Sequence, residues 1–212
     1  RNTLPAGSSV FRRLESGQLK PTDIGLDHMP KPGEKLKRPI MDFSTKLEDT
    51  DRYLGIAEAK KIAALSAKEF EEVKRKALAV DEFLTEHAES LGIEHADGKV
   101  EFVMSPKREL LLADVVGTMD ENRFLYKGLH LSKQAIRDYY LLSDWPAQVK
   151  KAFAEHRELP VPKPLPKELV SIMGNMYKSL CETWIGKRIW NALKLDEVVE
   201  AYRAFMEKAK AQ

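Results

Sequence analysis

The stretch 99–117, KVEFVMSPKRELLLADVVG, decides the fold class, because it is the most strand-like part of the chain. Apolar residues fill KVEFVM (99–104) and LLLADVVG (110–117), and SPKRE (105–109) between them is typical of a turn. The pattern predicts a β-hairpin that is buried on at least one face.

Two acidic residues, Glu101 and Asp114, lie inside these apolar strands. A carboxylate there is costly unless it is paired or holds a ligand. Carboxylates that face one another from adjacent strands repel unless a cation lies between them, and Mg²⁺ on the phosphates of ATP is such a cation. The pattern indicates a magnesium and ATP site. One acid facing solvent and the other meeting a Lys or Arg would fit the spacing equally well.

Asp97, Lys99 and Glu101 occupy alternate positions just before and within the first strand. Alternate residues of a strand point the same way, so this run would gather opposite charges at one spot. Protein kinases carry a comparable set of residues on a catalytic loop, and a metal-binding Asp follows that loop. Asp114 would correspond to this Asp.

Three further residues could bind anions. Arg123 follows TMDEN in an expected loop after the second strand, and Arg1 and Ser8 lie in expected loop or strand-edge positions. Guanidinium groups offer paired donors to phosphate, and the Gly7–Ser8 pair allows close backbone approach to an anion. A solvated surface charge is the commoner role for any one loop arginine.

The rest of the chain predicts helices with a few short strands. Ser66 and Glu69 form a capping box that opens an amphipathic helix ending at Gly92. The other expected elements are strands at 9–13 and 39–45, a surface loop at 15–38, helices at 132–142, 144–156, 167–184 and 196–210, and a stiff proline connector at 160–166. The fold class is α+β, an antiparallel sheet with flanking helices, with expected domains 1–142 and 143–212.

Composition excludes several classes of protein. Lys and Arg (35) nearly cancel Asp and Glu (33), and the net charge of +2 indicates no nucleic-acid or membrane partner. Cys181 is the only cysteine, which excludes an intrachain disulfide and favours a cytoplasmic setting, and the five histidines lack the spacing of a zinc site. No stretch approaches the roughly 20 apolar residues that span a bilayer.

Taken in order, several segments resemble SAICAR synthetase, the phosphoribosylaminoimidazole-succinocarboxamide synthase family. These segments are RN…AGS (1–8), PIMDFSTK (39–46), DGKVEF (97–102), LLADVVGTMDENRF (111–124) and LSKQAIRDYY (131–140). The motifs cover residues 1 to about 142, and the remainder resembles a longer carboxy-terminal form of some members.

The resemblance implies the larger lobe of a two-lobe, ATP-grasp or kinase-like fold, with a helical extension. It implies an ATP-dependent ligase that joins L-aspartate to the carboxylate of carboxyaminoimidazole ribonucleotide (CAIR), making SAICAR, ADP and phosphate. Arg1, Ser8 and Arg123 would hold CAIR, and Glu101 and Asp114 would bind Mg²⁺ on ATP. Lys99 and Asp97 would act beside the reacting carboxylate, and Lys46 is a candidate for binding aspartate.

Some positions depart from the family pattern. Val115 stands where the family commonly has an acid after the metal-binding Asp. Gly98 and Leu125 each stand where the family has an aromatic residue. The Asp51–Arg52 region replaces a His-Asp pair. No glycine-rich phosphate loop occurs here, so the chain is expected to lack the family's amino-terminal nucleotide-binding lobe and to be inactive alone. A non-catalytic binding module and a ligase for another carboxylate and amine remain alternatives, and a homo-oligomer is possible.

Overall fold

The computed structural model describes residues 1–46, 48 and 52–211, in which helices alternate with short antiparallel strands, as the predicted α+β class requires. The chain forms two compact units. The first comprises residues 1–86 and 95–122, and the second comprises 87–94 and 123–212. These units do not coincide with the expected domains 1–142 and 143–212, and that division stays a prediction.

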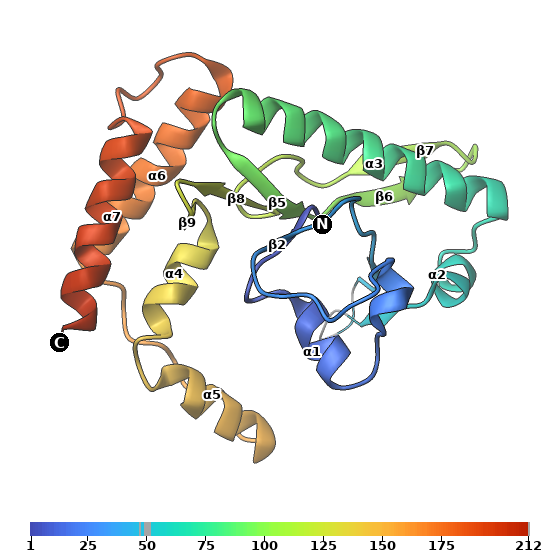
Figure 1. The fold of residues 1–212 in the computed structure, drawn as a ribbon, viewed down its shortest axis with the longest axis horizontal. Coiled ribbons are helices and arrows are strands. Elements are labelled where there is room, and N and C mark those ends of the chain that lie inside the picture. The colour runs from blue at the N-terminus through green and yellow to red at the C-terminus, as the bar shows by residue number, and fades with distance from the viewer. Residues whose placement is uncertain (47, 49–51, 212) are drawn as a thin grey trace. The chain divides into compact units, whose positions relative to one another are not determined.

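The first unit contains short strands and helices around one long helix (Figure 1). Its elements are β1 (Thr3–Leu4), α1 (Ser9–Glu15), the 3-10 helix η1 (Pro21–Ile24), β2 (Glu34–Lys35), β3 (Phe43–Ser44), β4 (Tyr53–Leu54), α2 (Ile56–Ile62), β6 (Glu101–Met104), β7 (Leu110–Ala113) and most of α3 (Ala67–Ser90) and β5 (Glu94–Gly98). Its two-stranded pairs are β1 with β2, β3 with β4, and β6 with β7. Thus most of its strands are too short to form an extended sheet.

The expected strand at 9–13 is wrong, because this segment forms helix α1. The hydroxyl of Ser8 accepts a hydrogen bond from the backbone N–H of Val10 and so caps the helix. Val10 and Leu14 then lie on one helical face and pack with Leu4 and Leu19 in a small apolar core. The helical spacing of these apolar residues thus outweighs the strand-like look of the local sequence.

The segment 15–38 is mostly loop, as predicted, although it also forms η1 and the two residues of β2. The expected strand at 39–45 is reduced to β3, which pairs with β4 so that Ser44 lies opposite Tyr53. Residues 47 and 49–51 lie outside the described residues, so Asp51, one of the positions noted above, is not placed.

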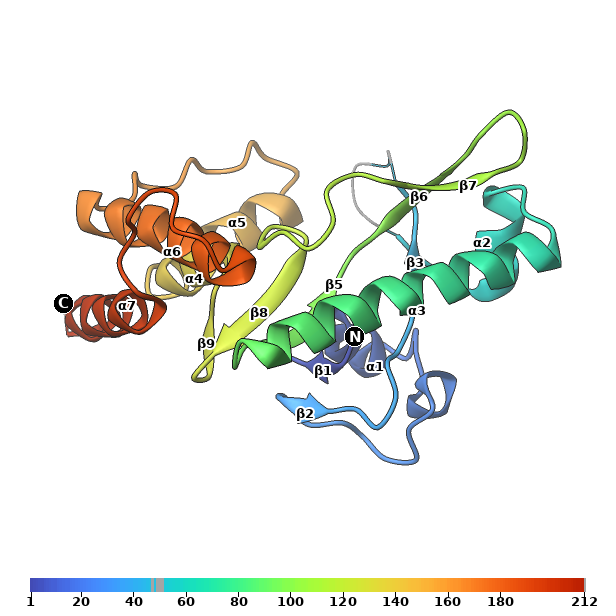
Figure 2. The ribbon, with the colours of Figure 1, turned by 90° about the horizontal axis from the view of Figure 1, so that it is seen from above.

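Helix α3 confirms the capping box. The backbone N–H of Ser66 donates to Glu69, that of Glu69 donates to the Ser66 hydroxyl, and Gly92 follows the helix in the left-handed conformation (φ 71°). The hairpin β6–β7 runs along this helix (Figures 1 and 2) and is anchored to it, because the Lys76 ammonium donates to the carbonyl of Leu110.

The predicted hairpin forms, but the expected burial of at least one face is wrong: Phe102 is only half-buried, and Leu112 opposite it is 45% exposed. Val103 pairs with Leu111 across the strands, and these two side chains are 51% and 49% exposed. The strand β5 before it, which carries Asp97, was not predicted as a strand. One face of the hairpin therefore carries an exposed pair of aliphatic side chains.

The second unit is mainly helical and confirms the expected helices. Its elements are β8 (Asn122–Tyr126), β9 (Leu129–His130), α4 (Lys133–Tyr140), α5 (Trp145–Ala154), α6 (Lys167–Ile185) and α7 (Leu195–Lys210). The first residue of β8, Asn122, is counted in the first unit. Helices α6 and α7 lie side by side (Figures 1 and 2). Arg123 lies in β8, so its expected loop position is wrong.

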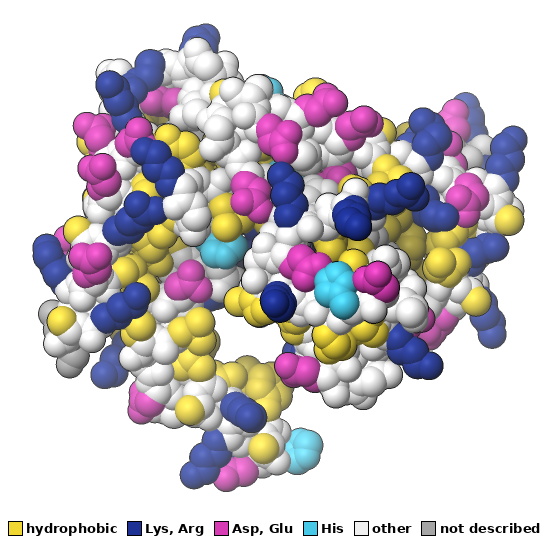
Figure 3. All heavy atoms as spheres, in the orientation of Figure 1, with side chains coloured by type: hydrophobic (Ala, Val, Ile, Leu, Met, Phe, Trp, Pro, Cys, Tyr) yellow, Lys and Arg dark blue, Asp and Glu magenta, His cyan; other side chains and the backbone are white. Residues whose placement is uncertain are grey.

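Within this unit, the ring of Trp184 lies 5.1 Å from that of Phe124 and 4.5 Å from that of His87. Trp184 therefore takes part in the packing of this unit, whereas Trp190 is half-exposed. None of the described helices is long and apolar enough to span a membrane. On the face seen in Figure 3, basic and acidic side chains lie interspersed.

Candidate functional site

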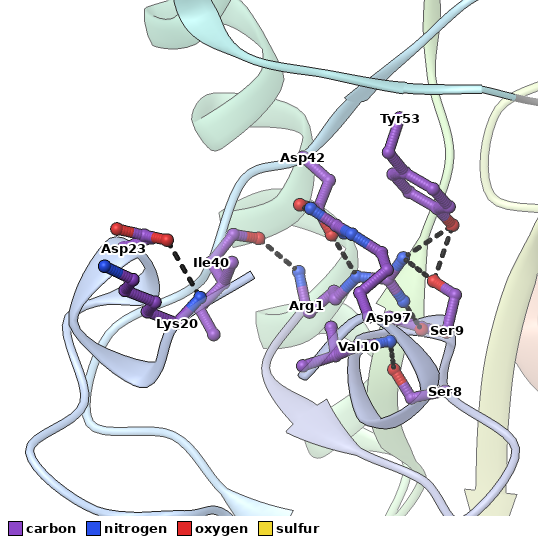
Figure 4. A network of polar contacts seen from close by, with 11 residues as sticks. Arg1, Ser8, Ser9, Val10, Lys20, Asp23, Ile40, Asp42, Tyr53 and Asp97 are labelled. Atoms are coloured by element: carbon purple, nitrogen blue, oxygen red, sulfur yellow. Dashed lines mark hydrogen bonds and ion pairs between the residues drawn. The ribbon is translucent and has the colours of Figure 1, made fainter. Parts of the chain in front are cut away.

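A cluster of charged groups surrounds Arg1 in the first unit (Figure 4). The Arg1 Nε donates to the Asp42 carboxylate at 2.9 Å, and Nη1 donates to the Asp97 carboxylate at 2.9 Å. The three side chains are only 8–14% exposed. Two predicted site residues, Arg1 and Asp97, are thus brought together from 96 positions apart.

The remaining nitrogen of this guanidinium meets neutral groups. Arg1 Nη2 donates to the Ser9 hydroxyl at 3.3 Å and to the Tyr53 hydroxyl at 3.2 Å, and these two hydroxyls are 2.6 Å apart (Figure 4). Strand pairing explains the arrangement. Tyr53 lies opposite Ser44, and Asp42 precedes Ser44 by two residues, so the β3–β4 register directs Asp42 and Tyr53 to one face.

Arg13 adds a second buried guanidinium. Its Nη1 donates to the other Asp42 oxygen at 2.9 Å, and its guanidinium carbon lies 4.2 Å from the centre of the Tyr53 ring. Asp42 therefore bridges two arginines. Burial alone would lower the pKa of the Arg1 guanidinium, but the charges of Asp97 and Asp42 outweigh it and raise that pKa above its ordinary value.

Ser8 lies next to this cluster and is 4% exposed. Its hydroxyl accepts from the Val10 N–H at 3.4 Å, so it serves as the cap of α1. The hydroxyl that contacts Arg1 belongs instead to Ser9.

A second group of charges surrounds Glu101. One carboxylate oxygen contacts the Lys46 ammonium, and the other accepts from Lys99 at 3.0 Å. Lys99 also lies 3.2 Å from Glu121. The hydrogen bond from Lys46, followed by that from Lys99, lowers the pKa of Glu101 below its ordinary value. The sequence predicted that Asp97, Lys99 and Glu101 lie together. Lys99 does pair with Glu101, but Asp97 pairs with Arg1 instead.

Asp114 lies immediately after β7, and the preceding Ala113 pairs with Glu101. Asp114 has φ 66° and leaves the strand ladder, and its carboxylate accepts from the Val115 N–H at 2.8 Å. The described residues contain no group of three or more His, Cys, Asp or Glu side chains that could hold a metal ion. Glu101 thus meets two lysines while Asp114 is exposed, which is the alternative that the spacing allowed. Mg²⁺ commonly uses one or two carboxylates together with water and phosphates, and the assignment of these two acids to it stays a prediction.

Arg123 belongs to the second unit and Arg1 to the first. The predicted convergence of these two residues on one substrate therefore stays a prediction.

Sequence reasoning missed Asp42, Arg13, Ser9 and Tyr53. Asp42 could have been found, because it lies between Met41 and Phe43 in an expected strand and so satisfies the argument applied to Glu101 and Asp114. Arg13 and Tyr53 carry no comparable local signal. Their role depends on the pairing of β3 with β4 and on a helix where a strand was expected.

The fold and the site define an α+β protein whose first unit carries a partly buried site of guanidinium, carboxylate, ammonium and hydroxyl groups suited to anionic ligands. Residues 7–156 match the SAICAR synthetase family. The match covers most of the chain, which therefore belongs to the SAICAR synthetase family.

Relatives support this membership. The chain is 41% identical over 210 residues to a putative phosphoribosylaminoimidazole-succinocarboxamide synthase of Archaeoglobus fulgidus, covering 98% of this chain and 63% of the relative. It is 35% identical over 187 residues to the phosphoribosylaminoimidazole-succinocarboxamide synthase of Thermoplasma acidophilum, covering 85% and 64%. The chain thus spans somewhat less than two thirds of the length of these relatives.

Solved structures show the same fold. SAICAR synthase from Saccharomyces cerevisiae, complexed with SAICAR, has a TM-score of 0.66 at 23% identity, over 90% of this chain and 60% of that one. A SAICAR synthetase in complex with ADP has a TM-score of 0.60 at 21% identity, over 89% and 62%. At such identities the likeness establishes the fold alone.

Proposed function

We propose that the chain takes part in the ATP-dependent joining of L-aspartate to the carboxylate of CAIR, giving SAICAR, ADP and phosphate in purine biosynthesis. The observation that carries this proposal is the partly buried Arg1 site, in which Arg1 and Asp97 from two separate family motifs form a direct ion pair. The relatives named as synthases, and the neighbours solved with ADP and with SAICAR, support the same reaction.

The proposed roles follow from the charges of the reactants. Arg1, Ser8 and Arg123 hold CAIR, Glu101 and Asp114 bind Mg²⁺ on ATP, and Lys46 binds aspartate. Lys99 and Asp97 lie beside the reacting carboxylate. Mg²⁺, when bound, would neutralise phosphate charge. Because all the reactants are anions, the site must supply cationic groups that offset their mutual repulsion.

A carboxylate is a poor electrophile, so ATP must first convert the CAIR carboxylate to an acyl phosphate or an equivalent. The amine of aspartate then attacks the acyl carbon, forms the amide bond and releases phosphate. The residues on this chain would contribute by holding the reactants in place and by stabilising charge. A cytoplasmic setting, as the lone Cys181 predicts, and small-molecule rather than macromolecular partners belong to the same proposal.

The test uses the chain alone and a chimera in which it replaces the matching part of the Archaeoglobus fulgidus relative. Each protein receives ATP, Mg²⁺, CAIR and aspartate, and ADP and the amide product are measured. We expect coupled formation of both by the chimera. Binding of CAIR or ATP without product would favour a non-catalytic binding module. Product from a different carboxylate and amine, with none from CAIR, would favour a ligase of other specificity.

A further inference from the structure

The three nitrogens of the Arg1 guanidinium differ in the strength of their contacts. Nε and Nη1 donate to carboxylates at 2.9 Å, whereas Nη2 donates to two neutral hydroxyls at 3.3 and 3.2 Å. Hydrogen bonds between two charged groups are shorter and stronger than those to neutral acceptors. Only the Nη2 edge can therefore take a new anionic partner at small cost.

We propose that Ser9 and Tyr53 are substrate-contact residues whose hydroxyls mark the place of the substrate phosphate group. This inference rests on the proposed function and adds two residues to the predicted set of Arg1, Ser8 and Arg123. On binding, a phosphate oxygen takes the position of the two hydroxyl oxygens at Nη2. The Ser9 hydroxyl donates to the Tyr53 oxygen at 2.6 Å without substrate, and with phosphate present both hydroxyls donate to the phosphate instead.

The charges around Arg1 explain why hydroxyls are needed. Arg1 and Arg13 carry two positive charges, and Asp42 and Asp97 carry two negative ones, so the cluster is neutral by itself. Arg1 alone therefore offers a weak net attraction to a dianion. Two additional O–H donors would add hydrogen bonds to a charged acceptor without changing this balance.

Arg13 and Asp42 act here as positioning residues. Arg13 lies against the face of the Tyr53 ring and also donates to Asp42, which in turn holds the Arg1 Nε. The ring and the guanidinium that present the Tyr53 hydroxyl and Nη2 are thus fixed by the same carboxylate. Figure 4 shows Asp42, Tyr53 and Ser9 around Arg1.

The experiment compares ligands with and without the phosphate group. Calorimetry measures the binding of CAIR, of its dephosphorylated nucleoside and of ribose 5-phosphate to the wild-type chain, to Tyr53→Phe and to Ser9→Ala. We expect each variant to bind the two phosphorylated ligands roughly tenfold more weakly, with unchanged affinity for the nucleoside. Tyr140→Phe is the control, because it removes a hydroxyl that donates to the Lys163 carbonyl in the second unit.

A purely structural role would weaken the binding of CAIR and its nucleoside equally, and that result would overturn the assignment. Equal CAIR affinity in wild type and both variants would overturn it as well, while leaving the proposed function in place. If the wild-type chain binds ribose 5-phosphate through these hydroxyls but never binds CAIR, the hydroxyl assignment is supported and the proposed function fails. Should wild type bind none of the three ligands, both fail.

Discussion

At the scale of single residues, Glu101 is one of the two acids that the proposed function assigns to Mg²⁺. Both of its carboxylate oxygens contact lysines, Lys46 and Lys99, and its side chain is 17% exposed. These cations keep the group ionised, because they lower its pKa. An ionised carboxylate flanked by two lysines can exchange one ammonium for a metal ion without passing through a protonated state.

We predict that Glu101→Gln in the chimera reduces Mg²⁺-dependent turnover by roughly tenfold or more, because the amide lacks the charge that a metal ion requires. Phosphate release at several Mg²⁺ concentrations would measure this effect. Glu109→Gln is the matched control, since Glu109 is an exposed acid in the turn of the same hairpin. Full activity of Glu101→Gln would remove Glu101 from the metal site.

His95 gives a second prediction at this scale. Its ring is buried between the Thr85 hydroxyl and the Asn122 amide oxygen, at 2.9 and 3.0 Å. Burial lowers its pKa below the ordinary value, so the folded state binds a proton less readily than the unfolded state. The stabilising contribution is present above the unfolded pKa and is lost as the pH falls through the folded value.

The free energy of unfolding should therefore fall between about pH 7.5 and pH 5.5, and His95→Gln should flatten that slope even if it destabilises the protein at every pH. Urea unfolding followed by far-UV circular dichroism at both pH values gives the comparison. His156→Asn replaces an exposed histidine and should keep the wild-type slope. An unaltered slope in His95→Gln would assign the pH dependence to other groups.

At the scale of elements, the turn of the hairpin is tied to the start of helix α3. Arg108, in the left-handed conformation (φ 63°), donates to both Glu69 oxygens at 2.8 and 2.5 Å, and Glu69 also caps the helix. The Arg108 hydrogen bonds, followed by those with Ser66, lower the pKa of Glu69 to about 2. The contact is thus kept at all but strongly acidic pH and is lost as the pH falls through that value.

Arg108→Ala should loosen the hairpin more than Arg108→Gly, because both lose the contact with Glu69 but glycine adopts the left-handed backbone without strain. Hydrogen exchange of the β6 and β7 amides measures the difference. If the two variants exchange at the same rate as wild type, the Arg108–Glu69 contact does not hold the hairpin.

Elements with a long repeated pattern were predictable from the sequence, whereas the short strands were not. Helix α3 combines a capping box with apolar residues at three- and four-residue spacing, so its start and end were both correct. Strands β1 to β4 have two residues each, too few for any periodicity to appear. Arg1 and Asp97 are 96 positions apart in the sequence. Each could be predicted as a site residue, but the sequence did not indicate that they form an ion pair.

At the scale of the whole molecule, all three tryptophans of the chain (Trp145, Trp184 and Trp190) belong to the second unit. In that unit, the hydroxyl of the buried Tyr202 donates to the carbonyl of Ala135 at 2.8 Å and connects α7 with α4. Burial raises the Tyr202 pKa, so the hydroxyl remains a donor throughout the physiological range. Tryptophan fluorescence therefore reports on the unit that this hydrogen bond stabilises.

Tyr202→Phe should lower the free energy of unfolding seen by tryptophan fluorescence by about 0.5–1.5 kcal/mol, because it removes a hydrogen bond between two buried groups. Urea titration of wild type and variant supplies the value. Tyr140→Phe, at the end of α4, removes a hydroxyl bound to an exposed carbonyl and should cost less. Equal losses in both variants would show that burial of the acceptor does not matter here.

The open face of the β6–β7 hairpin has a practical consequence. In this two-stranded sheet, the outer backbone edges of β6 and β7 lie beside the exposed apolar side chains of Val103 and Leu111. This combination favours edge-to-edge association between copies of the chain. The apparent molar mass of this chain measured by light scattering should rise with concentration, and Val103→Lys should suppress that rise. Binding studies are therefore best performed at low protein concentration, where the chain is monomeric.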